Sequence, residues 1–228
     1  AEEFSYNFQG NSQNLDHILA TAGLTARGRF DVVNVNDEFV SPTSDHDPIL
    51  ATFNFAEAVT VVAGDAGGLL TGAAGDDMLT GGGGEDRIRG FLGDDMLVGG
   101  ADKDLITSGR GDDVIEGGDG WDLIGGRLGD DTISGGNGRD VLLGGAGADV
   151  FVINEGETFG DVLFDFEAGV DTLELRGFGE DADLDVAIGA RRATVRVDGE
   201  RVAVVTSAEF RDVSEDDVVF APEDGFLA

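Results

Sequence analysis

The most regular chemistry-bearing residues are aspartates that recur every nine residues through the middle of the chain. From Gly72 to Val152 the sequence divides into nine consecutive nonapeptides without an insertion, among them GAAGDDMLT and SGRGDDVIE. The sixth residue of every unit is Asp, at Asp77, Asp86, Asp95, Asp104, Asp113, Asp122, Asp131, Asp140 and Asp149. Carboxylates combined with turn carbonyls are the hard oxygen ligands that suit Ca²⁺, so the array predicts structural Ca²⁺ sites.

The other positions of the unit predict the elements that hold these aspartates. Position eight is always apolar, from Leu79 to Phe151, and position four is Gly in every unit except at Asp102. We expect the last three residues of each unit to form a short strand with an inward apolar side chain, and the first six to form a glycine-rich turn. One nonapeptide cannot bury its apolar residue alone, so the units must stack.

A doubled acid reveals that the true period is two units. The odd units carry Asp76-Asp77, Asp94-Asp95, Asp112-Asp113 and Asp130-Asp131, whereas the even units carry Glu85, Lys103, Trp121 and Arg139 before the recurring Asp. Odd turns are therefore expected on one side of the stack and even turns on the other. Stacking places like carboxylates about 4.8 Å apart, where they repel unless a cation lies between them. A degenerate unit at 63–71 keeps Leu70 but has Gly68 in place of Asp.

Composition excludes several classes of protein. The net charge is −33, from 47 acids and 14 bases, and there is no cysteine, so disulfide scaffolds and Cys-ligated metals are ruled out. So few bases disfavour a broad basic nucleic-acid face. No apolar run approaches the roughly 20 residues of a membrane helix, and Glu2 and Glu3 stand where a secretory signal would be basic. With 41% apolar residues, an acidic disordered tail is also disfavoured.

The nonapeptides resemble the RTX family, whose GGxGxDxUx repeats form a Ca²⁺-loaded parallel β-roll. The resemblance implies export by a type I secretion apparatus without an N-terminal signal, and folding on Ca²⁺ outside the cell. Residues 161–178 resemble the β-sheet cap that follows such rolls, and residues 216–228 resemble the uncleaved C-terminal secretion signals. Asp165 and Asp171 are either further Ca²⁺ ligands or solvated surface acids. ATVRVDGERVAVV at 193–205 predicts a β-hairpin turning at Asp198-Gly199.

The first sixty residues carry a different pattern. GNSQNLDHIL at 10–19 and SDHDP at 44–48 resemble the C-terminal end of secreted nucleases of the endonuclease/exonuclease/phosphatase superfamily. The resemblance implies hydrolysis of phosphodiesters with Mg²⁺ or a similar divalent ion. His46 would contact the scissile phosphate or act as general base, Asp16 would orient His46, and Asp45 would bind the metal or position water. Asn11 lies in the same motif with a less defined role, and we expect His17 to have a packing or hydrogen-bonding role.

Only the last strands of that nuclease fold are expected here, at Phe4–Phe8, His17–Ala20, Phe30–Val35 and Ile49–Phe55. The family's other metal ligands come from an N-terminal half that does not match any part of this sequence. We therefore expect this chain alone not to be catalytic, so whether it is an enzyme is left open. The strands could pair with a separate N-terminal fragment or with copies of the chain.

Taken together, the sequence predicts an all-β chain: a parallel β-roll with a C-terminal β cap, preceded by a partial α/β sandwich. The predicted boundaries are 1–60 for the nuclease-like remnant, 61–152 for the roll and 153–228 for the cap. The predicted function is the Ca²⁺-binding C-terminal region of a secreted, metal-dependent nuclease or phosphodiesterase, with nucleic acid as a partner only when the rest of the enzyme is present. The alternative is a noncatalytic extracellular protein with a structural, adhesive or self-assembling role.

Overall fold

The computed structural model describes residues 6–8, 11–13, 58–64, 66–157, 160–179, 181–207 and 210–222. The chain divides into two compact units, Ala1–Phe53 and Asn54–Ala228. In the first, β1 (Tyr6–Phe8) and β2 (Asn11–Gln13) form an antiparallel pair. The predicted strands at 17–20, 30–35 and 49–55 lie outside the described residues, and with them the predicted α/β sandwich.

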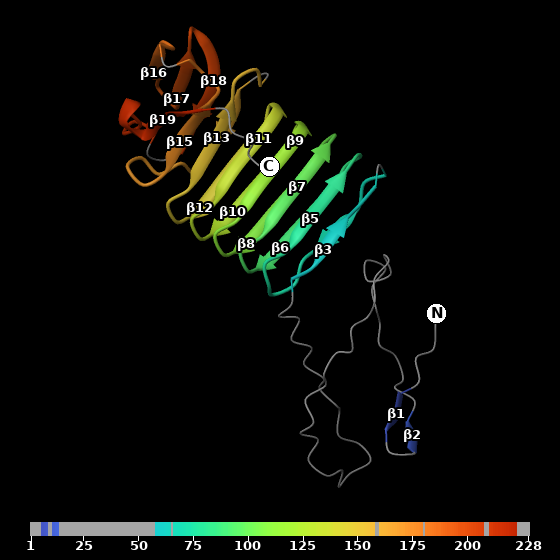
Figure 1. Ribbon diagram of the computed structural model, residues 1–228. Helices are drawn as coiled ribbons and strands as arrows, with labels where there is room; N and C mark the ends of the chain where they lie inside the picture. Colours follow the sequence, from blue (N-terminus) through green and yellow to red (C-terminus); the bar gives the residue numbers. More distant parts are fainter. Residues whose placement is uncertain are drawn as a thin grey trace. The chain divides into compact units, whose positions relative to one another are not determined.

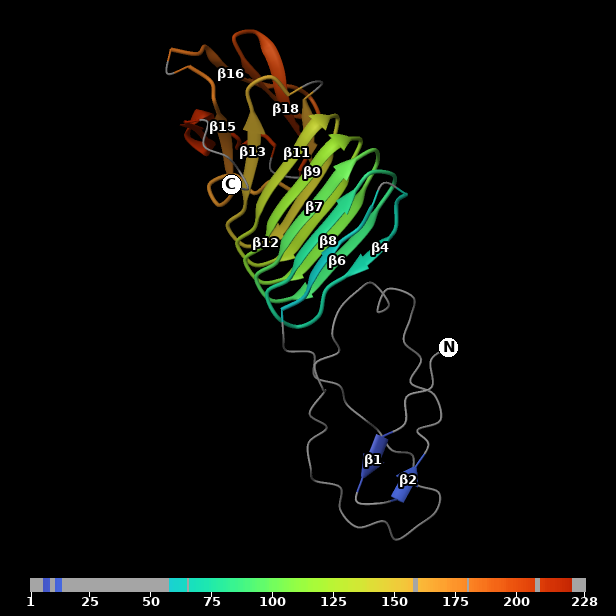
Figure 2. The ribbon, with the colours of Figure 1, turned by 45° about the vertical axis from the view of Figure 1, so that its right-hand side comes forward.

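The second unit is a parallel β-roll in which successive strands alternate between two sheets (Figure 1). One sheet contains β3 (Thr60–Val62), β5 (Met78–Gly82), β7 (Met96–Ala101), β9 (Val114–Gly120), β11 (Thr132–Gly138) and β13 (Val150–Asn154). The other contains β4 (Leu69–Thr71), β6 (Arg87–Leu92), β8 (Leu105–Arg110), β10 (Leu123–Leu128) and β12 (Val141–Ala146). Figure 2 shows the two sheets as facing layers joined by turns at their edges.

The pairing register confirms the predicted period of two nonapeptides. Ile115 on β9 lies opposite Leu97 on β7 and Ile133 on β11, each eighteen residues away. Ile124 on β10 has the same relation to Ile106 and Leu142 in the other sheet. Odd and even turns therefore stack along opposite edges of the roll, as the doubled acids indicated.

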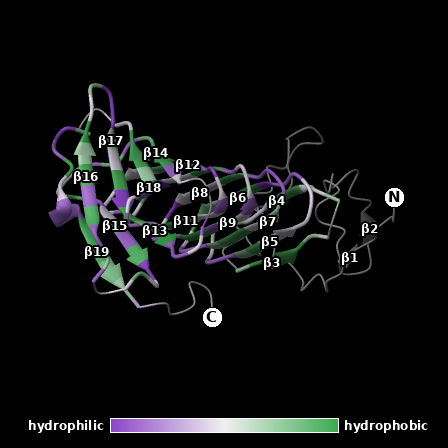
Figure 3. Ribbon diagram, turned by 90° about the horizontal axis from the view of Figure 1, so that it is seen from above, coloured by the Kyte–Doolittle hydropathy of each residue, from purple (hydrophilic) through white to green (hydrophobic). Residues whose placement is uncertain are grey.

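The core is a ladder of the position-eight side chains from both sheets. Each is 3% exposed or less, and the set comprises Leu70, Leu79, Ile88, Leu97, Ile106, Ile115, Ile124, Ile133, Leu142 and Phe151. Leu70 shows that the degenerate unit at 63–71 contributes to the same core. Burying such a side chain stabilises the fold by about 1.5–3 kcal/mol. In the hydropathy colouring of Figure 3, hydrophobic segments in green occur along the strands of the roll, mixed with white and purple ones.

The strands are longer than the predicted three residues per unit. From β6 onward most contain six or seven residues, because each of these continues through the first three or four positions of the next nonapeptide. The glycines there pair across coils, as Gly118 does with Gly100 and Gly136. Gly118 has a φ of 109°, and a Cβ on it would collide with the carbonyl oxygen of Gly100. Glycine thus extends the ladder where a turn was expected.

The cap prolongs both sheets and then covers their ends. β14 (Asp161–Leu163) pairs in parallel with β12, and β15 (Thr172–Arg176) with β13. The antiparallel strands β16 (Leu184–Ile188), β17 (Ala193–Val197) and β18 (Glu200–Val205) follow, and β19 (Val218–Ala221), after the 3₁₀ turn η2 (Glu215–Asp217), pairs with β15.

The predicted hairpin is confirmed at its turn. Asp198 and Gly199 join β17 to β18 with φ values of 53° and 83°, the left-handed pair that a two-residue Asp-Gly turn requires. Among the residues that the structure describes, no helix has the length and apolar composition of a membrane span.

Candidate metal centre

The recurring aspartates lie inside the two edges of the roll, not on its surface. Each stands at the end of a turn, directly before a strand whose second residue enters the core. All nine, from Asp77 to Asp149, are 2% exposed or less. Carboxylates are almost never this buried unless they are paired or bind a metal, so their surroundings decide what they can do.

In every position-six carboxylate except that of Asp86, one oxygen joins neighbouring coils. On the odd edge the backbone N–H of Asp95 donates to Asp113 Oδ1 at 2.7 Å, and that of Asp113 donates to Asp131 Oδ1 at 2.9 Å. On the even edge Asp104 donates in the same way to Asp122 Oδ1 at 2.8 Å. The position-six side chains thus form two buried ladders, and each of these bonded carboxylates reaches back to the coil before it.

The second oxygen has no such partner. Within the described part of the chain, Oδ2 is buried and without a hydrogen bond in Asp86, Asp95, Asp104, Asp113, Asp122, Asp131, Asp140 and Asp149. Asp77 differs, because its Oδ2 accepts from the N–H of Ala73. A buried acceptor left unsatisfied costs about 1–3 kcal/mol, and more when it is charged. Two rows of unpaired oxygens therefore indicate that something else occupies these edges.

Glycine at position one leaves room beside these oxygens. A Cβ built on Gly117 would lie 2.6 Å from Asp122 Oδ2 and 2.5 Å from the carbonyl oxygen of Gly135 on the next coil. The same combination of a carboxylate oxygen and a carbonyl oxygen faces Gly81 and Gly99. Each cradle therefore presents oxygen atoms from two coils to one small space that a side chain would fill.

The electrostatics of the ladders oppose ionisation. Burial raises the pKa of Asp95, Asp122 and Asp131 to about 7, and that of Asp104 and Asp149 to about 6, against an ordinary value of 3.8. Backbone hydrogen bonds oppose this rise, whereas the carboxylates of neighbouring coils add to it. The charged groups with the largest effects on the pKa of these five carboxyls are all acids, and neither ion pair found in the described residues involves them.

The odd edge carries a second, exposed ladder. The N–H of Asp94 donates to Asp76 Oδ1, that of Asp112 to Asp94 Oδ1 and that of Asp130 to Asp112 Oδ1, each at 2.9 Å. These carboxylates reach forward to the next coil, opposite to the buried ones beside them. The doubled acids of the sequence therefore form two antiparallel hydrogen-bond ladders on one edge.

The buried ladders continue into the cap. The N–H of Asp140 donates to Asp161 Oδ1 and that of Asp149 to Asp171 Oδ1, both at 3.0 Å. Asp165 accepts from the N–H of Gly144 at 2.9 Å. Asp165 and Asp171 were candidates from the sequence, whereas Asp161 was not predicted. The pattern that could have identified Asp161 is the Asp-x-apolar triplet Asp161-Val162-Leu163, which follows Asp140 after 21 residues and so falls outside the period.

Comparison with protein-family models finds one match, to the RTX calcium-binding nonapeptide repeat, over residues 71–106, 98–133 and 125–157. These segments coincide with the stacked coils and their aspartate ladders. The chain carries RTX calcium-binding repeats. No curated protein matches it.

Three solved structures show a limited similarity to the chain. The AlgE6R2 subunit of a mannuronan C5-epimerase from Azotobacter vinelandii is 26% identical, with a TM-score of 0.39 over 57% of this chain and 94% of that one. The AlgE6R3 subunit is 22% identical, with a TM-score of 0.30 over 83% and 91%. The extracellular lipase LipA from Serratia marcescens is 16% identical, with a TM-score of 0.33, and this chain spans 40% of its length.

The donor set of the RTX coils fits Ca²⁺. Oxygen is the only donor type at the cradles, with a carboxylate from one coil and a carbonyl from the next, and Ca²⁺ accepts six to eight such ligands. In the described residues, no three His, Cys, Asp or Glu side chains converge closely enough to hold a metal by themselves. Backbone carbonyls must therefore complete each shell, which is the part that the glycines make accessible.

The nuclease-like residues are not placed by the structure. Asp16, His17, Asp45 and His46 lie outside the described residues. Asn11 is the first residue of β2, where it pairs with Phe8. The catalytic assignment therefore stays a prediction from the sequence.

Proposed function

We propose that the position-six aspartates hold Ca²⁺ between successive coils and that, while these carboxylates are ionised, the roll folds only when they do. The proposed ligands are Asp77, Asp86, Asp95, Asp104, Asp113, Asp122, Asp131, Asp140 and Asp149. The observation that carries the proposal is the pair of buried carboxylate ladders, whose Oδ2 atoms, apart from that of Asp77, lack any hydrogen-bond partner within the described residues. Asp161 and Asp171 extend the same ladders and would serve the last coils.

The chain's own residues explain why folding would depend on the metal. Without a cation, like carboxylates of neighbouring coils repel and their burial is unfavourable, as the raised pKa values of Asp95 and Asp122 reflect. Bound Ca²⁺ supplies positive charge at that place. The Oδ1 hydrogen bonds keep each carboxylate oriented, and the position-one glycines keep the space beside Oδ2 open. Binding energy then becomes folding energy.

Circular dichroism during a Ca²⁺ titration tests this proposal. We expect little β structure in EGTA and cooperative folding as Ca²⁺ is added. Asp122→Asn, which keeps the shape but removes one charge, should raise the Ca²⁺ midpoint at least tenfold, since hydrogen bonds and ligands that involve a charge are worth about 1.5–3 kcal/mol. Asp183→Asn removes the same charge from an exposed site outside the ladders and should leave the midpoint unchanged. Equal β structure in EGTA and in Ca²⁺ would contradict the proposal.

We further propose that this roll belongs to a secreted, metal-dependent nuclease or phosphodiesterase. The support is the joint presence of GNSQNLDHIL and SDHDP in the order and spacing of that superfamily. His46 would act on the scissile phosphate or its attacking water, Asp16 would orient it, and Asp45 and Asn11 would serve the metal or water. A bound Mg²⁺ would stabilise charge on the phosphate, which explains how an acidic chain could act on nucleic acid.

Hydrolysis of DNA and RNA in Mg²⁺ tests this second part, measured on this chain and on the longest natural protein that contains it. We expect activity in the longer form only, lost in His46→Ala and retained in Asp37→Asn, an acid outside both strings. Hydrolysis by the short chain would refute the noncatalytic prediction. Absence of activity in both forms would favour the noncatalytic, structural or adhesive interpretation.

Export by a type I secretion apparatus completes the proposal. The low free Ca²⁺ of a cell interior would keep the ladders repelling and the chain unfolded for passage, and millimolar Ca²⁺ outside would fold it. The final residues resemble the signals of that route, but β19 (Val218–Ala221) belongs to the sheet. Deletion of residues 222–228 therefore removes the end of the signal-like segment 216–228 without the strand. We expect this deletion to abolish export while the purified variant still folds in Ca²⁺.

A further inference from the structure

The outer face of the roll departs from its repeat at one place. Position nine of the odd units is Thr80 and then Val98 in the first coils, but Glu116 and Ser134 in the next two. Position three of the even units changes in the same coils, from Gly83 and Ala101 to Asp119 and Asn137. These four polar residues lie on the neighbouring strands β9 and β11, with Glu116 opposite Ser134 and Asp119 opposite Asn137. The variable positions have therefore become polar together.

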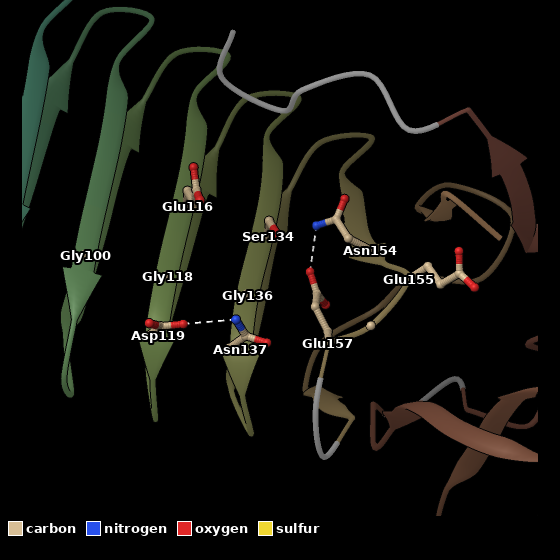
Figure 4. A pocket seen from close by; sticks show the side chains of 11 residues that line it. Gly100, Glu116, Gly118, Asp119, Ser134, Gly136, Asn137, Asn154, Glu155 and Glu157 are labelled. Atoms are coloured by element: carbon tan, nitrogen blue, oxygen red, sulfur yellow. Dashed lines mark hydrogen bonds between the residues drawn. The ribbon is translucent and has the colours of Figure 1, made fainter.

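A cavity of about 510 Å³ lies over these residues. Its floor is the glycine column of Gly100, Gly118 and Gly136, which has no side chains to fill the space. The turn after β13 forms the far wall with Asn154 and Glu157 (Figure 4). The size is within the range of about 300–1,000 Å³ typical of small-molecule sites.

Ser134 is the clearest sign that the cavity awaits a ligand. Its neighbour Ile133 points into the core, so Ser134 points outward into the cavity, yet the residue is only 2% exposed. Within the described part of the chain no hydrogen bond of its hydroxyl is found, in contrast to Ser108, which donates to the carbonyl oxygen of Gly126 at 2.8 Å. A ligand in the cavity would give this hydroxyl a partner.

The lining groups define the chemistry of that ligand. Asn137 Nδ2 donates to Asp119 Oδ1 at 2.9 Å, and Asn154 Nδ2 donates to Glu157 Oε1 at 2.6 Å. Each of these two amides therefore uses one N–H donor in a hydrogen bond within the lining. Among the described residues of the lining, the side chains that remain are acceptors or acids, and none of them is Lys, Arg or His. A matching ligand brings N–H donors and positive charge.

The burial of two acids in the lining agrees with a positively charged ligand. Burial raises the pKa of Glu116, and it raises that of Glu157 to about 7, with the carboxylates of Asp140 and Glu116 adding to the effect at Glu157. A single directly coordinated metal ion fits less well, because the cavity, at about 510 Å³, is far larger than an ion.

We propose that this cavity binds a small organic cation carrying primary ammonium groups. One ammonium group would lie between Glu116 and Glu157, and Ser134 Oγ and the glycine floor would accept its remaining N–H donors. The site is separate from the aspartate ladders, which lie at the edges of the sheets, whereas the cavity lies on the outer face of one of them.

Titration calorimetry on the full chain, folded in saturating Ca²⁺, tests the proposal with putrescine as the probe. We expect one molecule bound per chain. Glu157→Gln should weaken binding at least tenfold, and Ser134→Ala several-fold. Glu200→Gln, which removes the same charge from an exposed hairpin residue, should have no effect. Permethylated putrescine has the same charge but no N–H donors, and it should bind at least tenfold more weakly.

Circular dichroism in Ca²⁺ shows first that each variant folds. The proposal is overturned if putrescine does not bind, or if Glu200→Gln weakens binding as much as Glu157→Gln does, which would indicate attraction to the acidic chain in general. Equal binding of the permethylated compound also overturns it. A second arm titrates Mn²⁺ into the Ca²⁺-saturated protein. Mn²⁺ binding that is lost in Glu157→Gln, without any putrescine binding, would make this a metal site instead.

Discussion

The two edges of the roll use the same nonapeptide in different ways. The odd edge carries two ladders: Asp95 and its equivalents reach back to the previous coil, and Asp94 and its equivalents reach forward to the next. On the even edge the buried ladder of Asp104 and Asp122 is joined by isolated cross-coil bonds, such as that from Gly84 N–H to Asp102 Oδ2, and Lys103 and Trp121 stand where the odd edge has acids. One edge is therefore uniform and strongly negative, and the other is varied.

The comparison shows which features are common to the candidate Ca²⁺ sites of both edges and which vary from turn to turn. Burial, the hydrogen bond to Oδ1 and the unpaired Oδ2 are common to both edges, as Asp113 and Asp122 show. Position five can be an acid, a base or Trp, because its side chain lies outside the buried ladder. The backbone follows the same division: Gly93, Gly111 and Gly129 share φ values of 113–131°, whereas the equivalent even position is Asp102 in one coil.

The largest effect is expected from pH on the metal-free protein, and it should involve both edges equally. Asp95 and Asp131 on the odd edge, and Asp122 on the even edge, have pKa values raised to about 7 from an ordinary 3.8. A raised carboxyl pKa means that the folded state binds protons more tightly. Its contribution to stability is present below the unfolded value near pH 4 and is lost as pH rises through about 7.

In EGTA we therefore expect β structure to increase as pH falls from 8 to 5. In Ca²⁺ we expect the opposite trend, with β structure increasing as pH rises, because protons compete with the metal for the same oxygens. Urea unfolding followed by circular dichroism across this pH range measures both. Stability in EGTA that rises with pH would contradict the assignment of the ladders as buried, unpaired acids.

The next largest effect is expected from truncation of core side chains, and it should be the same in the two sheets. Ile115 and Ile124 are both fully buried, one in each sheet, and each packs between equivalents from the coils on either side. Replacing either with Ala should cost about 2–5 kcal/mol, measured by urea unfolding in saturating Ca²⁺. Costs that differ by more than about 1.5 kcal/mol would mean that the sheets are not equivalent halves of one core.

The exposed ladder should contribute less, and only on the odd edge. Asp112 Oδ1 accepts from the N–H of Asp130, so Asp112→Ala removes one cross-coil hydrogen bond. We expect a loss of about 0.5–1.5 kcal/mol in Ca²⁺. Arg139→Ala, at position five of the even edge, removes no hydrogen bond found in the described residues and should change stability by less than about 0.5 kcal/mol. Equal losses would show that position five acts through charge and not through the ladder.

The repeat made most of the fold and of the candidate metal site predictable from the sequence. A period of eighteen residues, with Asp at position six and an apolar residue at position eight, determines which side chains enter the core and which carboxylates stack. Strand length was not predictable, because the glycines that signal turns also permit the tight pairing of Gly100 with Gly118. Asp161 was missed because the cap lengthens the spacing to 21 residues. The cavity depends on positions that the repeat leaves variable, together with a turn that lies outside it.

The smallest effect is expected when the odd pattern is transferred to the even edge. The double variant Trp121→Asp and Arg139→Asp would give two successive even turns the doubled acids of the odd ones. The backbones before them differ, since Gly138 has a φ of 144° while Gly120 is not left-handed. A carboxylate at position 121 should therefore not align with the N–H of residue 139. We expect stability in Ca²⁺ to change by less than about 0.5 kcal/mol, as measured by urea unfolding. A gain of about 1 kcal/mol, the worth of a new hydrogen bond, would show that the acid alone builds the second ladder and that the uniform odd backbone follows from it.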